Sequence, residues 1–552
     1  MKTPLTQINH LSFPKKDHKH VWQSAFGASG TSALAALAEK ENQFCVYVAA
    51  TSEIARQVAQ EIDFFSSKHF TRLVLPEWET LPYDLFSPHG DIVSERLSTL
   101  ASLPSLKTGV LIVTASTLMQ RLPPPQYIIN NTFDLQVGKQ FDPLAQRERL
   151  ISCGYRTVDT VFNRGELAIR GSIFDLFPMG SDFPIRIDIF DSEIETLRTF
   201  DPDTQRTIEQ TDLMQILPGK EFPLDQIGIE RFKKSWHESF VTDVRSCPLY
   251  QDVNSGLAPQ GLEYYFPFFF EKTGTLFDYL PQSTLFAIET ETDSAANEFW
   301  ELVRARYESY RYDTERPIPP PEAIYLTWHQ VLDRVKQDRQ ILIDNTKQKT
   351  KHVVNIGGKP LPDIVINHRL NDPIKLLRAF VANIDVNVLF TAPTNGRLEH
   401  LLNLLQKFGL QVTPLENLNE FVSNQTPLAI TKASIERGLW NTSIAIITET
   451  NILGSQSATD ASLHRSKTND PDTIVRNLTE LSIDAPVVHL DHGVGRYKGL
   501  ETLKIDEQTV EFLSLLYADD AKLYVPVTSL HLISRYTGAS ADAAPLHRLG
   551  SD

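Results

Sequence analysis

The 552-residue sequence has few cysteines, and they are far apart: Cys45, Cys153 and Cys247. This spacing forms neither a disulfide framework nor a CxxC metal motif, which favours a reducing, cytoplasmic compartment. No apolar run approaches the roughly 18 residues that a membrane-spanning helix needs, and the first residues are polar. We therefore expect a cytoplasmic protein with no membrane partner.

Positive charge is also in short supply. The chain has 53 Lys and Arg against 69 Asp and Glu, a net charge of −16. Because duplex affinity depends on neutralising phosphates, this balance argues against DNA binding by the whole surface, although a local basic groove stays possible. Proteins are the more natural partners. With 41% hydrophobic and 22% charged residues, the composition is that of a globular protein, and the length predicts roughly three to five domains.

The first part of the chain alternates buried-type strands with helices. Residues 44–49 and 110–113 are continuous apolar runs, and a helical pattern covers 53–58. Such runs indicate a parallel sheet covered on both faces. We expect this α/β domain over residues 1–118, and a second stretch of it over 213–324 with a buried strand at 285–288.

Between these two stretches the apolar period changes to two. Residues 164–171 and 185–190 alternate in the manner of half-buried strands, so we expect an inserted, mostly antiparallel domain over 119–212. The proline-rich run 317–321 predicts a domain boundary, because consecutive prolines hold the chain extended.

The rest of the chain divides into three parts. Strands at 387–390 and 443–447 predict a small α/β domain over 325–454, and the polar residues that follow predict a linker over 455–480. From 481 to 548 several short strands are separated by Gly- and Asp-containing turns, which is typical of a small β-barrel. The expected fold class is therefore α/β multidomain, with a parallel-sheet domain, an inserted antiparallel domain, a further small α/β domain and a C-terminal barrel.

Glycines in the terminal part invite a nucleotide-binding interpretation. Gly493, Gly495 and Gly499 follow an apolar strand, as the glycines of a dinucleotide fingerprint do. That fingerprint requires a helix next, whereas 501–505 and 512–517 read as more strands. We expect these glycines to serve turns that need positive φ.

Two segments stand where a helicase-type ATPase carries its nucleotide motifs. The place of the P-loop is taken by Gly27, Gly30, Thr31 and Ser32. A P-loop needs a lysine to neutralise phosphate charge, and no lysine occurs from this segment up to Lys40. After a buried strand, Glu289 is followed by Thr290 where the second magnesium-binding carboxylate is required. We predict a degenerate P-loop-type domain with an inactive nucleotide site, no catalytic residue and no bound metal.

Several longer segments resemble the bacterial transcription-repair coupling factors. They are residues 76–84 (PEWETLPYD), 170–178 (RGSIFDLFP), 277–281 (FDYLP), and the terminal block 486–497 with 521–526. The resemblance implies a module like the repair protein UvrB, with domain 1a at 1–118, the inserted domain 2 at 119–212 and domain 1b at 213–324. It further implies a 325–454 domain of unclear role and an RNA polymerase interaction domain, a Tudor-like barrel, at 481–548.

Members of that family continue into a RecA-like motor, an ATP-hydrolysing DNA translocase, and the sequence ends at Asp552, about where the motor is expected. The resemblance implies that ATP and magnesium act only through that missing motor, which is also the main DNA-binding part. For the residues present it implies an adaptor in transcription-coupled nucleotide excision repair, with UvrA and the RNA polymerase β subunit as partners. The alternatives are an active DNA-dependent ATPase or helicase, and a UvrB-like damage-binding protein.

One strand of the inserted domain carries a candidate binding surface. Ile185, Ile187 and Ile189 share one face of that strand, so Arg186, Asp188 and Phe190 share the other. A phenylalanine on a charged face is either covered by neighbouring structure or available to a partner. The resemblance implies the second case, with Arg170, Arg186 and Phe190 as the UvrA-binding patch.

In the terminal barrel, residues 509–515 alternate imperfectly and fit either an edge strand or an ordinary barrel strand. An exposed edge offers unpaired backbone groups that a partner strand can complete. The family binds the polymerase β subunit by such strand addition. The resemblance therefore implies a polymerase-binding segment around Glu511, Phe512 and Leu513.

Two further groups are open to more than one interpretation. Trp78, Tyr83 and Phe86 fit base stacking or, more simply, a packed loop, since no basic residues lie among them. His489, His492 and His531 have no nearby cysteine and match no standard zinc spacing, so we predict no metal there.

Overall fold

The computed structural model describes residues 11–15, 18–345, 352–366, 372–454, 484–489, 493–505, 508–518, 521–526 and 533–535. The predicted linker 455–480 lies outside these residues. The chain divides into two compact units, Met1–Ser455 and Gln456–Asp552.

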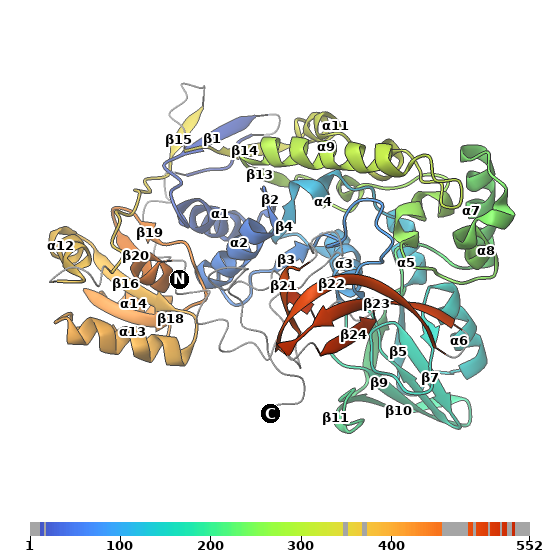
Figure 1. The fold of residues 1–552 in the computed structure, drawn as a ribbon. Coiled ribbons are helices and arrows are strands. Elements are labelled where there is room, and N and C mark those ends of the chain that lie inside the picture. The colour runs from blue at the N-terminus through green and yellow to red at the C-terminus, as the bar shows by residue number, and fades with distance from the viewer. Residues whose placement is uncertain are drawn as a thin grey trace. The chain divides into compact units, whose positions relative to one another are not determined.

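The first domain is built on a seven-stranded, entirely parallel sheet (Figure 1). Its spatial order is β15 (Val353–Asn355), β1 (Lys19–Gln23), β14 (Arg339–Ile343), β13 (Leu285–Glu289), β2 (Phe44–Ala49), β4 (Gly109–Thr114) and β3 (Arg72–Leu75). Every residue of β2 and β4 is buried, as their continuous apolar runs predict.

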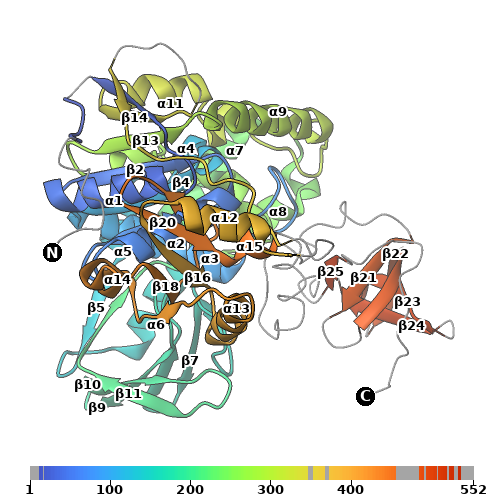
Figure 2. The same ribbon diagram turned by 90° about the vertical axis from the view of Figure 1, so that its left-hand side faces the viewer.

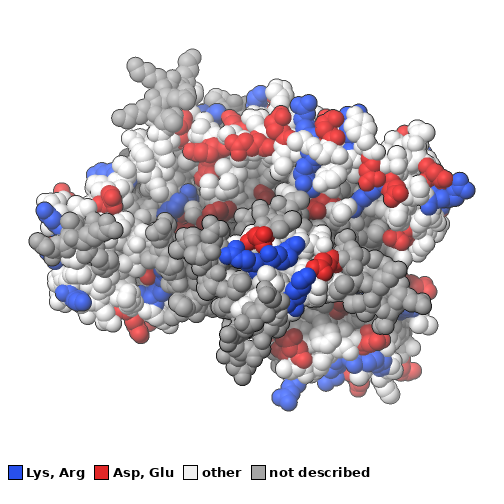
Figure 3. All heavy atoms as spheres, viewed as in Figure 1, with Lys and Arg blue, Asp and Glu red and all other residues white. Residues whose placement is uncertain are grey.

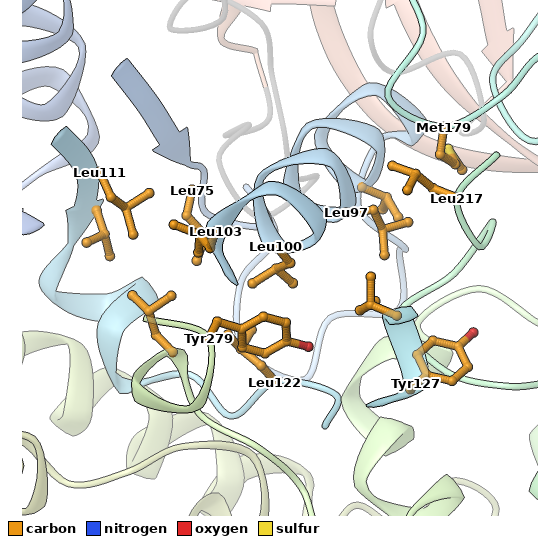
Figure 4. Close-up of a cluster of buried hydrophobic side chains, with 14 of the residues drawn as sticks. Leu75, Leu97, Leu100, Leu103, Leu111, Leu122, Tyr127, Met179, Leu217 and Tyr279 are labelled. Atoms are coloured by element: carbon orange, nitrogen blue, oxygen red, sulfur yellow. The ribbon is translucent and has the colours of Figure 1, made fainter. Parts of the chain in front are cut away.

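Helices cover both faces of this sheet. One face packs on α1 (Ser29–Glu41) and α2 (Ser52–Phe65), and α2 begins where the Thr51 hydroxyl accepts a hydrogen bond from the Ile54 amide. The other face packs on α3 (Gly90–Ser102), α4 (Ala115–Met119), α9 (Thr292–Tyr310) and α11 (Trp328–Val335). Figure 4 shows this second core, where Leu100 of α3 lies close to Tyr279 and Leu97 of the same helix lies near Leu217.

The first sheet continues past residue 324, where we expected the domain to end. β14 and β15 follow that position and belong to the sheet. The proline run 317–321 is no exposed linker either: Ile318 is buried and the Pro317 carbonyl accepts a hydrogen bond from the Tyr265 hydroxyl. Local composition predicts an extended chain there, but not what packs against it.

An aromatic cluster fills the part of the first domain between 222 and 325. It involves α5 (Pro125–Asn131), α7 (Gln226–Ser239), α8 (Pro248–Asn254) and α10 (Pro321–Ile324) together with the 3₁₀ segment Leu262–Phe269. Trp78 and Tyr83 are buried in this cluster, so the packed-loop interpretation is correct for these two residues.

The inserted domain is a six-stranded, mostly antiparallel sheet, as predicted. Its order is β11 (Thr207–Thr211), β10 (Glu193–Phe200), β9 (Ile185–Phe190), β8 (Ile173–Leu176), β7 (Glu166–Arg170) and β6 (Arg156–Thr157), and β6 and β7 form its one parallel pair among the described strands. Helix α6 (Pro143–Ser152) packs on one face, and a small ladder joins β5 (Phe133–Gln136) to β12 (Leu213–Ile216).

A third domain has its own five-stranded sheet, with helices around it (Figure 2). The order is β17 (Thr413–Pro414), β18 (Leu428–Lys432), β16 (Asn387–Ala392), β20 (Ile444–Thr448) and β19 (Leu439–Trp440), the last pair antiparallel. Its helices are α12 (Lys375–Asn383), α13 (Asn395–Lys407), α14 (Leu418–Asn424) and α15 (Glu449–Leu453).

The second unit contains a five-stranded antiparallel sheet. Its order is β24 (Lys522–Pro526), β23 (Gln508–Leu516), β22 (Gly493–Ile505), β21 (Pro486–His489) and β25 (Ile533–Arg535). Gly499 lies where the register of the β22–β23 ladder shifts, and it adopts a positive φ of +111°, which glycine allows. Gly495 differs from our expectation: it lies within the strand, where a Cβ would come 2.9 Å from the Tyr517 ring.

Candidate functional site

The six-stranded sheet turns one face to its hydrophobic core and the other to a set of charged side chains. Ile185 and Ile187 are fully buried, and Ile189 packs against the same core. Arg186 and Asp188 are half-buried on the opposite face. The facial assignment from the alternation of β9 is therefore confirmed.

Two arginines on this face hold one buried carboxylate. Asp175 of β8 lies opposite Arg186 of β9 and is fully buried. Arg186 donates from Nε and Nη2 to its two oxygens at 2.7 and 2.9 Å, and Arg170 of β7 donates from Nη2 at 2.5 Å. We call Arg170, Asp175 and Arg186 the arginine clamp.

The clamp fixes the guanidinium of Arg186 in place. Its hydrogen bonds to Asp175 raise the pKa of Arg186, so the group stays charged despite partial burial. The same guanidinium lies 4.6 Å above the ring of Phe200, a cation–π arrangement. Arg170 keeps about half of its side chain exposed. The clamp therefore presents positive charge that is already oriented.

Phe190 lies on the same face, four residues beyond Arg186. It is 71% exposed. It pairs with Glu193 across a two-residue turn, Asp191 and Ser192, whose φ values are +50° and +62°. Positive φ at both central residues is the tight hairpin turn that matches strand twist. A short, well-defined turn thus holds an apolar ring out in solvent.

Sequence reasoning missed Asp175, although a signal for it exists. Gly171 and Ser172 form a two-residue connection between the paired residues Arg170 and Ile173. Such a short turn fixes the register of the hairpin and places Asp175 on the same face as Arg170. A second missed pair, Asp188 with Arg198 of β10, continues the charged face.

The residues of the predicted nucleotide site come together at the start of α1 and the end of β13. Thr31 and Ser32 are buried in the first turn of α1, which has no side-chain N-cap. Glu289 is also buried, and its Oε1 accepts a hydrogen bond from the Tyr47 hydroxyl at 2.7 Å. Burial raises the pKa of Glu289. The Thr290 hydroxyl donates to the Ile343 carbonyl.

A residue that the sequence did not suggest completes this cluster. Arg437, from the third domain, lies 3.4 Å from the Thr31 hydroxyl and 3.9 Å from Glu289. Gly27 and Gly30 flank the start of α1, and Gly27 has φ +55°. No local sequence pattern predicts the contact between Arg437 and Thr31, which are 406 positions apart.

The terminal sheet corrects one expectation. Phe512 and Leu513 do not lie on an edge strand, because β23 is paired with β22 on one side and with β24 on the other. Leu513 is fully buried in the small core, and Phe512 is buried too. Glu511 is paired with Thr502 of β22. A charged residue at position 513 would therefore disrupt the core of this sheet.

Other site classes have no support among the described residues. No group of three or more His, Cys, Asp or Glu side chains is arranged to hold a metal within the part of the chain that the structure describes. His492 and His531 lie outside that part. No helix in the described ranges is both long and apolar enough to cross a membrane.

The surface of the first unit carries much of the negative charge. Figure 3 shows acidic side chains gathered over the region where α9 begins. Glu291, Asp293, Glu298 and Glu301 are exposed there. This distribution makes the α9 region a poor surface for nucleic acid.

Three family models match separate parts of the chain. The UvrB interaction domain matches residues 133–222, the D3 domain of MFD matches 380–452, and the CarD-like/TRCF RID domain matches 481–537. The first match contains the arginine clamp and Phe190, and the third contains the terminal sheet.

Curated relatives match the chain from end to end. The transcription-repair-coupling factor of Haemophilus influenzae is 40% identical over 558 residues, covering all of this chain and 48% of the relative. That of Escherichia coli is 40% identical over 530 residues, with 95% and 46% covered, and that of Bacillus subtilis is 24% identical over 508, with 87% and 42% covered. The chain spans about half the length of the curated relatives it matches. The predicted resemblance to the transcription-repair-coupling factors is thus confirmed along the whole chain.

Proposed function

We propose that this chain is an adaptor in transcription-coupled nucleotide excision repair. Its inserted domain binds UvrA and its terminal domain binds the β subunit of RNA polymerase. Support comes from the matches to the UvrB interaction domain and to the CarD-like/TRCF RID domain, together with the transcription-repair-coupling factors as relatives.

The observation that carries the UvrA assignment is the exposed Phe190 beside the arginine clamp. An apolar ring on a tight turn loses little conformational freedom when a partner covers it. An oriented arginine next to it is a frequent partner in interface hot spots. The opposite face of the sheet packs on the hydrophobic core, so a partner of this sheet would meet the face that carries Phe190.

A double substitution tests this surface. Arg186→Ala with Phe190→Ala should weaken UvrA binding by up to about a thousandfold, because each anchor is worth roughly 2 kcal/mol when desolvated. Leu144→Ala is the matched control: Leu144 is an exposed apolar residue on α6, which packs on the opposite face of the same sheet. Unchanged UvrA affinity in the folded double variant would refute the assignment.

The polymerase assignment rests on the terminal domain as a whole. A chain that ends at residue 454 removes the second compact unit and leaves the first intact. It should lose binding to the polymerase β subunit and keep binding to UvrA. Retained β binding would show that another part of the chain is responsible. Glu511 stays a candidate contact, without the edge-strand argument.

We also propose that the described residues do not turn over ATP, since the nucleotide site lacks its lysine and second carboxylate. The measurement is ATP hydrolysis by the 552-residue chain with and without DNA, which should stay at background. Hydrolysis stimulated by DNA would instead favour the ATPase alternative.

A further inference from the structure

A loop of the third domain inserts against the degenerate nucleotide site of the first. Residues 435–438 lie in the connection between β18 and β19, and we call them the insertion loop. Ile435 is buried in the same hydrophobic cluster as Leu34 and Leu37 of α1. The rest of the third domain holds the loop in place, because the hydroxyls of Thr448 and Thr450 both donate to the Glu436 carbonyl. The loop is therefore a shaped element with partners on both sides.

Arg437 at the centre of the loop is held by a buried acid. Its Nε and Nη2 donate to the two oxygens of Glu61 at 2.7 and 2.8 Å, and Glu61 is fully buried in α2. This two-pronged geometry is the strong form of an arginine–carboxylate pair. The same guanidinium reaches the Thr31 hydroxyl at 3.4 Å and lies 3.9 Å from Glu289.

The backbone of the loop makes an equally close approach. The Gly438 carbonyl accepts a hydrogen bond from the Ala28 amide at 3.0 Å, just before α1 begins. A Cβ on Gly27 would come 2.0 Å from that carbonyl oxygen, and a Cβ on Gly438 would come 2.4 Å from Asn451 and Leu361. The absence of a side chain at Gly27 thus allows the two backbones to meet, and Gly438 fits against the side chains of Asn451 and Leu361.

These contacts correspond one by one to what a working site offers its nucleotide. In a P-loop, backbone amides ahead of the helix bind phosphate oxygens and a lysine supplies positive charge. Here the Ala28 amide is bound by a carbonyl oxygen of the chain itself. A guanidinium lies between the residue in the lysine position, Thr31, and the acid that would face magnesium, Glu289.

We propose that the insertion loop is a permanent internal occupant of the degenerate nucleotide site. The Gly438 carbonyl replaces a phosphate oxygen, and Arg437 replaces the missing lysine. The place that nucleotide takes in a working site here joins the third domain to the first. The role of the third domain includes keeping this site closed.

Unpaired polar atoms at the site are consistent with the proposal. The hydroxyls of Ser29 and Ser32 and the Oε2 of Glu289 are buried without a hydrogen-bond partner in the part of the chain that the structure describes. They belong to residues that would surround phosphate and magnesium in a working site. The loop provides hydrogen-bond partners for the Ala28 amide and for the Glu61 carboxylate, but none for these three atoms.

Hydrogen exchange of the full 552-residue chain tests the proposal. Arg437→Ala should speed amide exchange in both 24–34 and 433–439 by at least about tenfold, because each segment loses the other as its cover. Arg437→Lys keeps the charge but loses the fork, and should give an intermediate increase. If Arg437→Ala does not fold, the lysine variant carries the test alone. Exchange equal to wild type in the folded variants would overturn the proposal.

Arg56→Ala is the matched control. Arg56 also joins α2 to the insertion loop, through Glu436, but this pair is exposed on both sides. Its removal should leave exchange in 24–34 near the wild-type rate. An effect as large as that of Arg437→Ala would mean that any contact of the loop matters equally, and would overturn the specific role given to Arg437.

A second experiment measures directly whether nucleotide can enter the degenerate site. Titration of the wild-type chain with a fluorescent ATP analogue and magnesium should show no saturable binding. Saturable binding that unlabelled ATP displaces, with protection of 24–34 from exchange, would show that nucleotide reaches the site and would overturn the proposal.

Discussion

The inserted domain and the third domain each present an arginine to a buried carboxylate, yet the two ion pairs face different surroundings. Arg186 holds the fully buried Asp175 on a sheet face that also carries the half-exposed Arg170 and the exposed Phe190. Arg437 holds Glu61 between two domains of the same chain. The chemistry is the same, so the residues around each pair decide its role. The pair in the inserted domain lies beside exposed residues that suit an outside partner, and the pair between two domains serves the chain itself.

The largest expected effect on stability comes from breaking the pair of Arg437 and Glu61 between the two domains. Arg437→Ala leaves Glu61 buried without its partner, which should lower the free energy of unfolding by about 3–5 kcal/mol. Urea unfolding followed by tryptophan fluorescence measures this. Arg56→Ala, the exposed control, should cost about 1 kcal/mol or less. Equal losses in the two variants would contradict the distinction between buried and exposed pairs.

Breaking the pair of Arg186 and Asp175 should have a smaller effect on stability. Asp175→Asn keeps the shape of the side chain but removes the charge that both arginines share. Because Arg170 is half exposed and can turn to water, we expect a loss of about 2 kcal/mol. UvrA affinity should fall with it, since Arg186 loses its orientation. A variant of full stability and unchanged UvrA affinity would show that the clamp does not position Arg186.

A third substitution should stabilise the chain. Burial raises the pKa of Glu289 above its usual 4.5. Between the usual and the raised pKa the folded state binds more protons, so the free energy of unfolding falls as pH rises. Glu289→Gln should therefore raise stability at pH 7 by about 0.5–1 kcal/mol.

This difference should disappear below pH 4.5, where the carboxyl is protonated in both the folded and the unfolded chain. Unfolding of the two proteins at pH 7 and pH 4 makes the comparison. Lower stability of the glutamine variant at both values would contradict the account of Glu289 as a leftover acid.

The smallest effect on stability belongs to Phe190. Since its ring already lies in solvent, Phe190→Ala should change the free energy of unfolding by less than about 0.5 kcal/mol. The same change should weaken UvrA binding by about thirtyfold. Thermal unfolding and a UvrA titration on one preparation separate the two quantities. A substitution that costs stability without affecting UvrA would mean that Phe190 is a packing residue.

Local patterns predicted what depends on local physics. Alternation in β9 placed Ile187 and Arg186 on opposite faces, because strand geometry has a period of two. Continuous apolar runs located β2 and β4 in the parallel sheet. The interpretation of a degenerate nucleotide site rests on the fixed spacing of a P-loop and stays a prediction.

Features that depend on contacts between residues far apart in the sequence could not be predicted. Whether β23 is an edge or an inner strand depends on where β24 returns, and the alternation of 509–515 does not encode that. The first sheet recruits β14 and β15 from beyond an expected boundary for the same reason. Arg437 meets Glu61 across 376 positions, so only the packed chain brings them together.

The most direct test of the adaptor account is hydrogen exchange of the chain with and without UvrA. The account predicts slower exchange in 166–190, which covers β7 to β9 and ends at Phe190, and unchanged exchange in 24–34 and 433–439. Bound UvrA with no protection in 166–190 would contradict it.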